Sequence, residues 1–284
     1  MDHLHRELAP ITPEAWDQID TEAKRTLRRT LAGRKLVDFK GPLGWQCSSF
    51  GLGRTERIEG PRDGVKASLR VTRPLVELNV PFQLARSEVD AMARGARDAD
   101  LSAVVAAART AALTEDHAVF EGYARAGIQG IFEGGADHAL PLSDEYEQYP
   151  QAVASALTWL RNQGVEGPYA IALGPRCYEG LTETTNKGGY PVINMVTQQL
   201  DGRLIWAPAV DGALVMSLRG GDFELVVAED FSIGYASHDA EHVMLYLEES
   251  MTFMLYTPEA AVPLRYQAAV PTASAGRQGS RRRD

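Results

Sequence analysis

Two histidines near the carboxy-terminal end of the sequence have the spacing of a metal site. His238 and His242 lie four positions apart, with Asp239 and Glu241 between them. On a helix this spacing places both imidazoles on one face, where they can bind zinc. Residues 243–247 predict a strand, however, and along a strand positions four apart lie about 13 Å from each other. We therefore expect no metal site here.

The other residues that could do chemistry form no recognisable catalytic motif. The chain has six histidines and several serines and acids, so a serine protease is one interpretation. No Gly-x-Ser-x-Gly elbow selects a nucleophile, and the sequence has no Walker loop or dinucleotide-binding fingerprint. His117 follows Glu115 and Asp116 in a predicted helix and is typical of a structural or surface histidine. We expect a protein that is not an enzyme.

Length and composition describe the scaffold that must position any site. The 284 residues, 44% of them hydrophobic, can bury the core of one elaborated domain or two small ones. Apolar runs such as 103–108 are far shorter than the roughly 20 residues of a membrane span, and the start does not resemble a signal peptide. We expect a soluble, intracellular protein. Cys47 and Cys177 lack metal-type spacing, so they are unpaired thiols or partners in a disulfide between subunits.

Charge is distributed unevenly along the chain. The formal net charge is −9, but residues 265–284 hold five arginines and one aspartate, so the remaining body is near −13. An acidic body disfavours the packaging of nucleic acid. The composition of the tail predicts disorder. The run 281–283 is either a solvated end or a binder of anionic surfaces.

Helical periodicity is clearest in two segments. Thr12 and Pro13 form a good cap and first turn, and an apolar stripe predicts a helix over 13–32 that ends at Gly33. Asp100 can cap a long helix that keeps an apolar face over about 24 residues and stops at Gly127.

Alternating residues over 65–72, preceded by Asp63-Gly64, predict a hairpin with 54–58. Its apolar face suits either an internal hairpin or an arm that packs on a neighbouring subunit. A second α/β unit follows, with helices at 151–162 and 175–184 and strands at 169–173 and 204–207. The polar, glycine-containing loop 184–190 precedes its last strand and is typical of a mobile surface loop. The final strands are expected at 223–228, 243–247 and 251–256.

One stretch, 220–235, is more specific than these periodicities. Gly220-Gly221-Asp222 predicts a turn before an apolar strand. Together with 166–169, 8–12, 33–38, 41–45 and 120–122, this stretch closely resembles encapsulin shell proteins, the formers of bacterial nanocompartments once classed as linocin-type bacteriocins. The resemblance is nearly collinear over roughly residues 1–264.

The resemblance implies an α+β chain with the phage major-capsid (HK97-like) fold, including a P-domain, an A-domain and an extended E-loop. Residues 1–142 would form the amino-terminal helix, E-loop hairpin and P-domain with its spine helix, 143–219 the A-domain, 220–264 the return to the P-domain and 265–284 the disordered basic tail. The 13–32 helix would then lie on the inner shell wall.

The resemblance also implies two sites. A groove for the targeting peptide of a cargo protein would be formed by Leu27, Leu31, Arg34, Asp38, Phe39, Ile233 and Tyr235. Arg34 and Asp38 would fix the register of the peptide through charge-assisted hydrogen bonds or would form a structural ion pair. A pore at the fivefold axis would be lined by Thr184, Thr185, Asn186, Lys187, Gly188, Gly189 and Tyr190.

The implied function is a self-assembling icosahedral shell, of about sixty subunits, that encloses a cargo enzyme in a cytoplasmic nanocompartment. A dye-decolourising peroxidase is the first choice of cargo and a ferritin-like protein the second. No flavin is expected, because Ser87 stands where flavin-binding members have a tryptophan. No nucleic acid or membrane partner is expected. The alternatives are a prophage major capsid protein and a linocin-type bacteriocin or protease.

Overall fold

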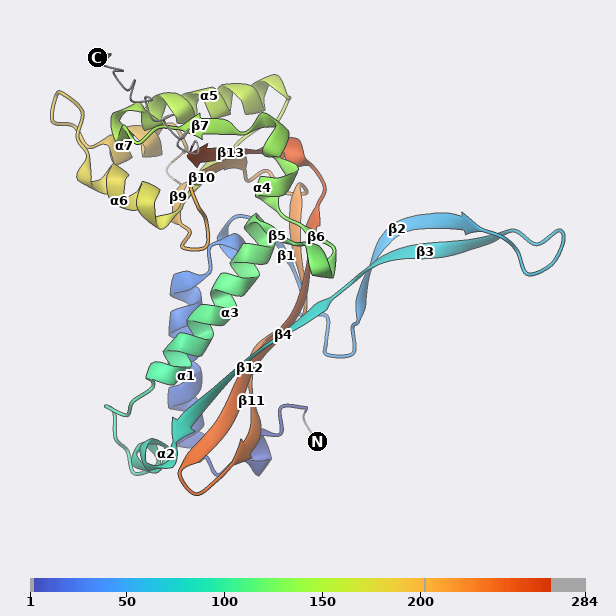
Figure 1. The fold of residues 1–284 in the computed structure, drawn as a ribbon, viewed down its shortest axis with the longest axis vertical. Helices are drawn as coiled ribbons and strands as arrows, with labels where there is room; N and C mark the ends of the chain where they lie inside the picture. Colours follow the sequence, from blue (N-terminus) through green and yellow to red (C-terminus); the bar gives the residue numbers. More distant parts are fainter. Residues whose placement is uncertain (1–2, 202, 267–284) are drawn as a thin grey trace, which may run out of the picture.

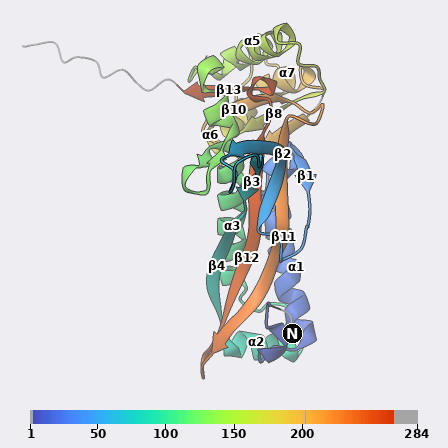
Figure 2. The ribbon, with the colours of Figure 1, turned by 90° about the vertical axis from the view of Figure 1, so that its right-hand side faces the viewer.

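The structure is a computed structural model that describes residues 3–201 and 203–266. The chain is elongated (Figure 1). One end holds a five-stranded sheet with three helices, the other holds long helices against a four-stranded sheet, and a hairpin projects sideways from between them. Figure 2 shows the two sheets stacked along the long axis of the molecule.

The four-stranded sheet has the order β1-β11-β12-β4. Its strands are β1 (Asp38–Lys40), β4 (Val76–Ala85), β11 (Phe223–His238) and β12 (His242–Leu255). Helices α1 (Pro13–Thr30) and α3 (Ser102–Phe120) run side by side against this sheet, and α2 (Arg86–Ala93) lies at its far end (Figure 1). Apolar side chains of α1, α2, α3, β4, β11 and β12 form one continuous core.

The five-stranded sheet has the order β7-β13-β10-β8-β9. Its strands are β7 (Leu140–Leu142), β8 (Tyr169–Leu173), β9 (Arg203–Trp206), β10 (Ala213–Ser217) and β13 (Ala261–Tyr266). Every residue of β8 and β10 is buried. Helices α5 (Tyr149–Asn162), α6 (Pro175–Glu183) and α7 (Val192–Gln198) supply the side chains that cover these strands in a second core.

The projecting hairpin pairs β2 (Ser49–Ile58) with β3 (Ala67–Pro74) in antiparallel register (Figure 1). No residue of either strand is fully buried within the chain. A small ladder of β5 (Gly122–Tyr123) and β6 (Ile128–Gln129), followed by α4 (Ile131–Gly134), connects the two larger parts.

The predicted helices are confirmed, with shifted ends, and the one predicted at 151–162 begins two residues earlier, as α5. Thr12 Oγ1 accepts from the N–H of Ala15 at the start of α1, which ends at Thr30 rather than beside Gly33. The Asp100 carboxylate accepts from the N–H of Ser102. The long helix α3 ends at Phe120 because Gly122 turns the backbone at φ +99°, where any added Cβ would lie 2.8 Å from the Gly130 nitrogen.

Several predicted strands are longer than expected or are joined. The strand predicted at 223–228 continues to His238 as β11, and those at 243–247 and 251–256 are one strand, β12. The chain then adds β13 to the five-stranded sheet, so the segment 220–264 contributes to both sheets. Arg265 and Tyr266, assigned to the tail, are the last residues of β13, and residues 267–284 lie outside the described part.

No helix within the described residues is long and apolar enough to cross a membrane.

Candidate functional site

An open groove runs along α1 where this helix meets β11, and we call it the α1 groove. Its larger hollow, of about 340 Å³, is lined by Lys24, Leu27, Arg28, Leu31, Arg34, Lys35, Asp230 and Phe231. A second hollow of about 190 Å³ continues it and is lined by Leu4, Arg6, Asp20, Ala23, Lys24, Leu27, Phe231, Ser232, Ile233 and Leu247. The two hollows share Lys24, Leu27 and Phe231 and therefore lie side by side, and together they give the α1 groove an apolar floor and a charged rim.

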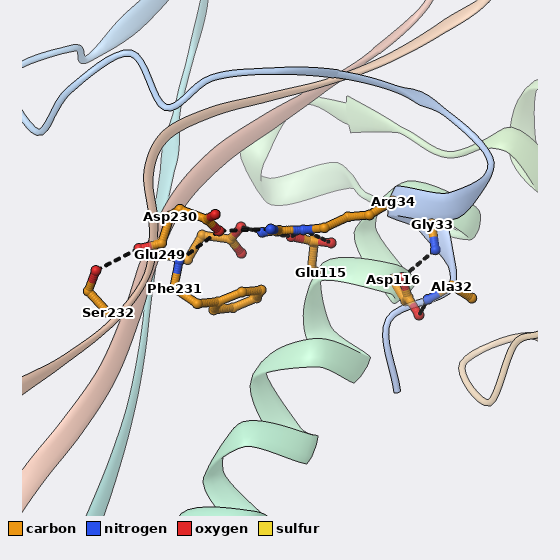
Figure 3. A network of polar contacts seen from close by, with 9 residues as sticks. All are labelled: Ala32, Gly33, Arg34, Glu115, Asp116, Asp230, Phe231, Ser232 and Glu249. Atoms are coloured by element: carbon orange, nitrogen blue, oxygen red, sulfur yellow. Dashed lines mark hydrogen bonds and ion pairs between the residues drawn. The ribbon is translucent and has the colours of Figure 1, made fainter. Parts of the chain in front are cut away.

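Arg34 anchors the end of this groove to the rest of the protein (Figure 3). Its Nε donates to both carboxylate oxygens of Glu115, and its Nη2 lies 2.6 Å from Glu115 Oε2 and 2.7 Å from Glu249 Oε1. Its Nη1 donates to Asp230 Oδ1 at 2.8 Å. The guanidinium also lies 4.8 Å from the ring of Phe231. All these donors are therefore engaged within the chain.

The buried charges of this cluster shift one another's ionisation. Burial opposes the charge of Arg34, but the hydrogen bond to Glu115 and the charges of its three acidic partners raise the pKa of Arg34. Burial and the adjacent Glu115 raise the pKa of Glu249, against the opposing effect of Arg34. The charge of Arg34 and the raised pKa of Glu249 both reduce the uncompensated negative charge of this cluster. The arrangement is that of a structural anchor.

A second buried carboxylate fixes the backbone beside Arg34. Asp116 accepts from the N–H groups of Ala32 and Gly33, both at 2.8 Å, and so holds the end of α1 against α3 (Figure 3). Burial raises the pKa of Asp116 to about 7, although these two hydrogen bonds oppose the shift.

The structure brings some of the predicted groove residues together and separates others. Leu27, Leu31 and Arg34 line the larger hollow, and Ile233 lines the smaller one. Asp38 instead lines a different hollow and accepts from the N–H of Gly221 at 2.6 Å. Arg34 therefore forms a structural ion cluster, but its acidic partners do not include Asp38.

The two remaining predicted groove residues lie beside the groove. Phe39 stacks 5.1 Å from the Arg34 guanidinium. The backbone N–H of Tyr235 donates to the carbonyl of Leu4, and its hydroxyl contacts His238. Neither residue lines the two hollows.

Phe231 is the groove residue that sequence reasoning missed. It lines both hollows and remains partly exposed, whereas Ile233 is 4% exposed and belongs to the core. The sequence did contain a signal for Phe231. Every second residue of a strand points to the same face, so residue 231 is expected on the same face as 233 and 235.

The 184–190 loop lies between α6 and α7, in the part of the molecule that contains the five-stranded sheet (Figure 1). It is a closed turn. Asn186 Oδ1 accepts from the N–H groups of Gly188 and Tyr190, both at 2.9 Å, and the Asn186 backbone pairs with Tyr190. Lys187 and Tyr190 are exposed, so a compact turn presents polar side chains to the surroundings.

His238 and His242 do not lie on one strand, in contrast to the prediction from the sequence. His238 ends β11 and His242 begins β12, so a tight turn, rather than one strand, separates them. Asp239 Oδ1 accepts from the N–H groups of Glu241 and His242 and stabilises this turn. Within residues 3–201 and 203–266, no cluster of three or more histidine, cysteine or acidic side chains could hold a metal ion.

The fold defines a class of protein. The chain is similar to a virus-like particle from Pyrococcus furiosus, with a TM-score of 0.61 and 17% identity over 88% of this chain and 98% of that one. It is also similar to a chain of Mycobacterium phage Ogopogo, with a TM-score of 0.54 and 11% identity over 84% and 92% of the two chains. At these identities the likeness concerns the fold alone, which is the HK97-like capsid fold.

Sequence similarity identifies the family within that class. The family model described as "Encapsulating protein for peroxidase" matches residues 1–252. A type 1 encapsulin shell protein of Rhodospirillum rubrum is 55% identical over 93% of this chain and 97% of its own length. One of Mycobacterium tuberculosis is 44% identical over 94% and 100%. The chain belongs to the family of type 1 encapsulin shell proteins, whose named members are shell components rather than enzymes.

Proposed function

We propose that this chain is the repeating unit of a closed icosahedral cage that encloses a cargo enzyme in a cytoplasmic nanocompartment. The observation that carries the proposal is the 55% identity to a type 1 encapsulin shell protein over nearly the whole length of both chains. The capsid fold supports it, because cages form when copies of one fold repeat under closed symmetry. The proposal implies that the chain assembles with copies of itself. The smallest icosahedral cage contains about sixty subunits.

The parts of the fold take separate roles in this proposal. The four-stranded sheet with α1 and α3 is the P-domain, the five-stranded sheet is the body of the A-domain, and the β2–β3 hairpin is the E-loop. The compact 184–190 turn lines a pore at the fivefold axis. Its polar side chains would admit small substrates and exclude proteins.

Cargo docks in the α1 groove through a carboxy-terminal targeting peptide. Support comes from the apolar floor of Leu27, Leu31 and Phe231, which suits alternate apolar side chains of an extended peptide. The first candidate for the cargo is a dye-decolourising peroxidase, because the family description names a peroxidase. The second candidate is a ferritin-like protein.

The first experiment is size-exclusion chromatography of the purified protein, followed by negative-stain electron microscopy. Uniform hollow particles are expected. A monomer or small oligomer under conditions that favour assembly would overturn the cage.

Docking is tested with Leu31→Asp shells and Ile233→Asp shells, by measuring the cargo that co-purifies. Because Leu31 and Ile233 are both nearly buried, at 6% and 4% exposed, cargo is compared only among variants that form intact shells, and Thr21→Asp on an exposed position of α1 is the matched control. Intact Leu31→Asp shells with undiminished cargo would remove this residue from the docking site.

A further inference from the structure

Positive charge gathers on the rim of the α1 groove. Lys24 and Arg28 lie four positions apart on α1, and therefore on one face of the helix. Lys35 reaches the same hollow from the turn that follows α1. All three side chains are exposed. Asp230, the single acidic residue that lines the larger hollow, is engaged by Arg34.

These three cations have no carboxylate at ion-pair distance among the described residues. Neighbouring cations differ in this respect, because Arg25 pairs with Glu22 and Arg6 pairs with Asp20. The groove therefore presents unpaired positive charge in a chain whose formal net charge is −9. Such a local excess attracts an anionic group.

The position of the charge relative to the apolar floor restricts the ligand. Lys24 lines both hollows and so stands at their junction, above Leu27 and Phe231. Arg34 cannot serve the ligand in the same way, because three carboxylates already occupy its donors. A ligand that fills the groove must place apolar side chains on the floor and an anionic group at the rim.

The carboxy-terminal tail of this chain does not meet that requirement. Residues 267–284 carry four arginines and one aspartate, so their charge has the same sign as the groove rim. A separate peptide with a negative charge is the complementary occupant.

We propose that the α1 groove binds a peptide in which a carboxylate lies beside the apolar residues and pairs with Lys24 and Arg28. This inference rests on the proposed docking function and specifies the chemistry of the peptide. The carboxylate can come from an aspartate or glutamate side chain or from the carboxy terminus of the cargo, since both present the same group to the two cations.

The test uses a fluorescent protein that carries a short carboxy-terminal peptide with leucines at alternate positions, co-expressed with the full chain. Three versions have Asp, Asn or Lys at one central position between the leucines. The amount of fluorescent protein per shell is measured after size-exclusion chromatography. We expect the Asp version to load about fivefold more than the Asn version, the effect of one or two exposed ion pairs, and the Lys version to load least.

Charge reversal of the rim should invert this order. In Lys24→Glu/Arg28→Glu shells, the Lys version is expected to load better than the Asp version. Arg25→Glu/Arg29→Glu shells are the matched control, because both residues are exposed on α1 but do not line either hollow, and they should keep the wild-type order. A neutral extension after the peptide distinguishes the two sources. The extension moves the terminal carboxylate away from the rim, so a preference for that group should disappear. A preference for an aspartate or glutamate side chain should remain unchanged.

The outcomes separate this inference from the function on which it rests. Equal loading of the Asp, Asn and Lys versions would leave docking in place and overturn the requirement for a carboxylate. The same Asp preference in the charge-reversed shells would also overturn it. If none of the versions enters intact shells, the docking function itself falls, and this inference with it.

Discussion

Arg34 joins three parts of the chain that are distant in sequence, and its replacement should be costly. Arg34→Met leaves Glu115 and Glu249, both buried, without their cationic partner. Removal of one member of a buried ion pair typically costs 3–5 kcal/mol, and we expect a loss of about that size in the free energy of unfolding, measured by urea denaturation. Arg29→Met, at an exposed position of α1, should change it by less than about 0.5 kcal/mol. A loss for Arg34→Met as small as that of the control would show that the cluster is not an anchor.

Asp116 predicts a pH dependence of stability. Burial raises its pKa to about 7 from the ordinary value of 3.8, so the folded protein binds a proton that the unfolded chain releases. The stability from this group is complete below about pH 4 and is lost as the pH rises through 7. We expect Asp116→Asn to remove this contribution.

The measurement is the unfolding free energy of wild type and Asp116→Asn at several pH values from 5 to 8. The advantage of wild type over the variant should shrink as the pH rises, since the other titrating groups are common to both. A difference that stays constant over this range would contradict the raised pKa.

Strand β13 makes the end of the described chain part of the fold. The Tyr266 hydroxyl lies 2.6 Å from that of Tyr149 and 3.2 Å from Cys177 Sγ, and Arg265 pairs with Glu121 at 2.6 Å. We expect truncation after Tyr266 to leave stability and assembly unchanged. Truncation after Leu264 should lower the thermal unfolding midpoint, because it leaves buried polar groups of Tyr149 and Cys177 with fewer partners.

Tyr266→Phe in the full-length chain removes the hydroxyl and keeps the strand. Its thermal unfolding midpoint should lie between those of the two truncated chains. If the chain that ends at Tyr266 fails to form shells, residues 267–284 are needed for assembly, and the prediction of a dispensable tail is wrong.

Elements with clean local signals were predictable, and those that depend on distant partners were not. Strand β8 was predicted at its observed bounds because five consecutive apolar residues are enclosed by turn residues. Helix α7 has only seven residues and was missed. Strand β4 was also missed. It contains Pro81, which a sheet tolerates here because β4 is an edge strand.

The same distinction applies to the α1 groove. The apolar stripe of α1 is visible in the sequence because it repeats every three or four residues. The acidic partners of Arg34 lie 81, 196 and 215 positions away, so no local pattern could reveal that its guanidinium is already engaged.

The β2–β3 hairpin is a surface that the single chain leaves uncovered. Ile58 opposes Ala67 across the two strands, and Leu69 lies two residues further along β3, so the three share one face. Ile58 is 47% and Leu69 is 59% exposed. An exposed apolar face on a projecting arm marks a contact with another molecule, and in a cage that molecule is a second copy of this chain.

Two charges on that face should therefore prevent assembly without unfolding the subunit. We expect Ile58→Asp/Leu69→Asp to elute as monomers or small oligomers in size-exclusion chromatography and to keep the circular dichroism of the folded protein, because the hairpin contributes no buried side chain to either core. Thr55→Asp/Ser68→Asp places the same two charges on the opposite face of the hairpin and should still form cages visible by negative stain. Closed cages from the first variant would show that the apolar face is not an interface. If neither variant forms cages, the added negative charge itself prevents assembly. Each subunit carries the same added charges, so any repulsion between them is repeated at every copy of the interface around the shell.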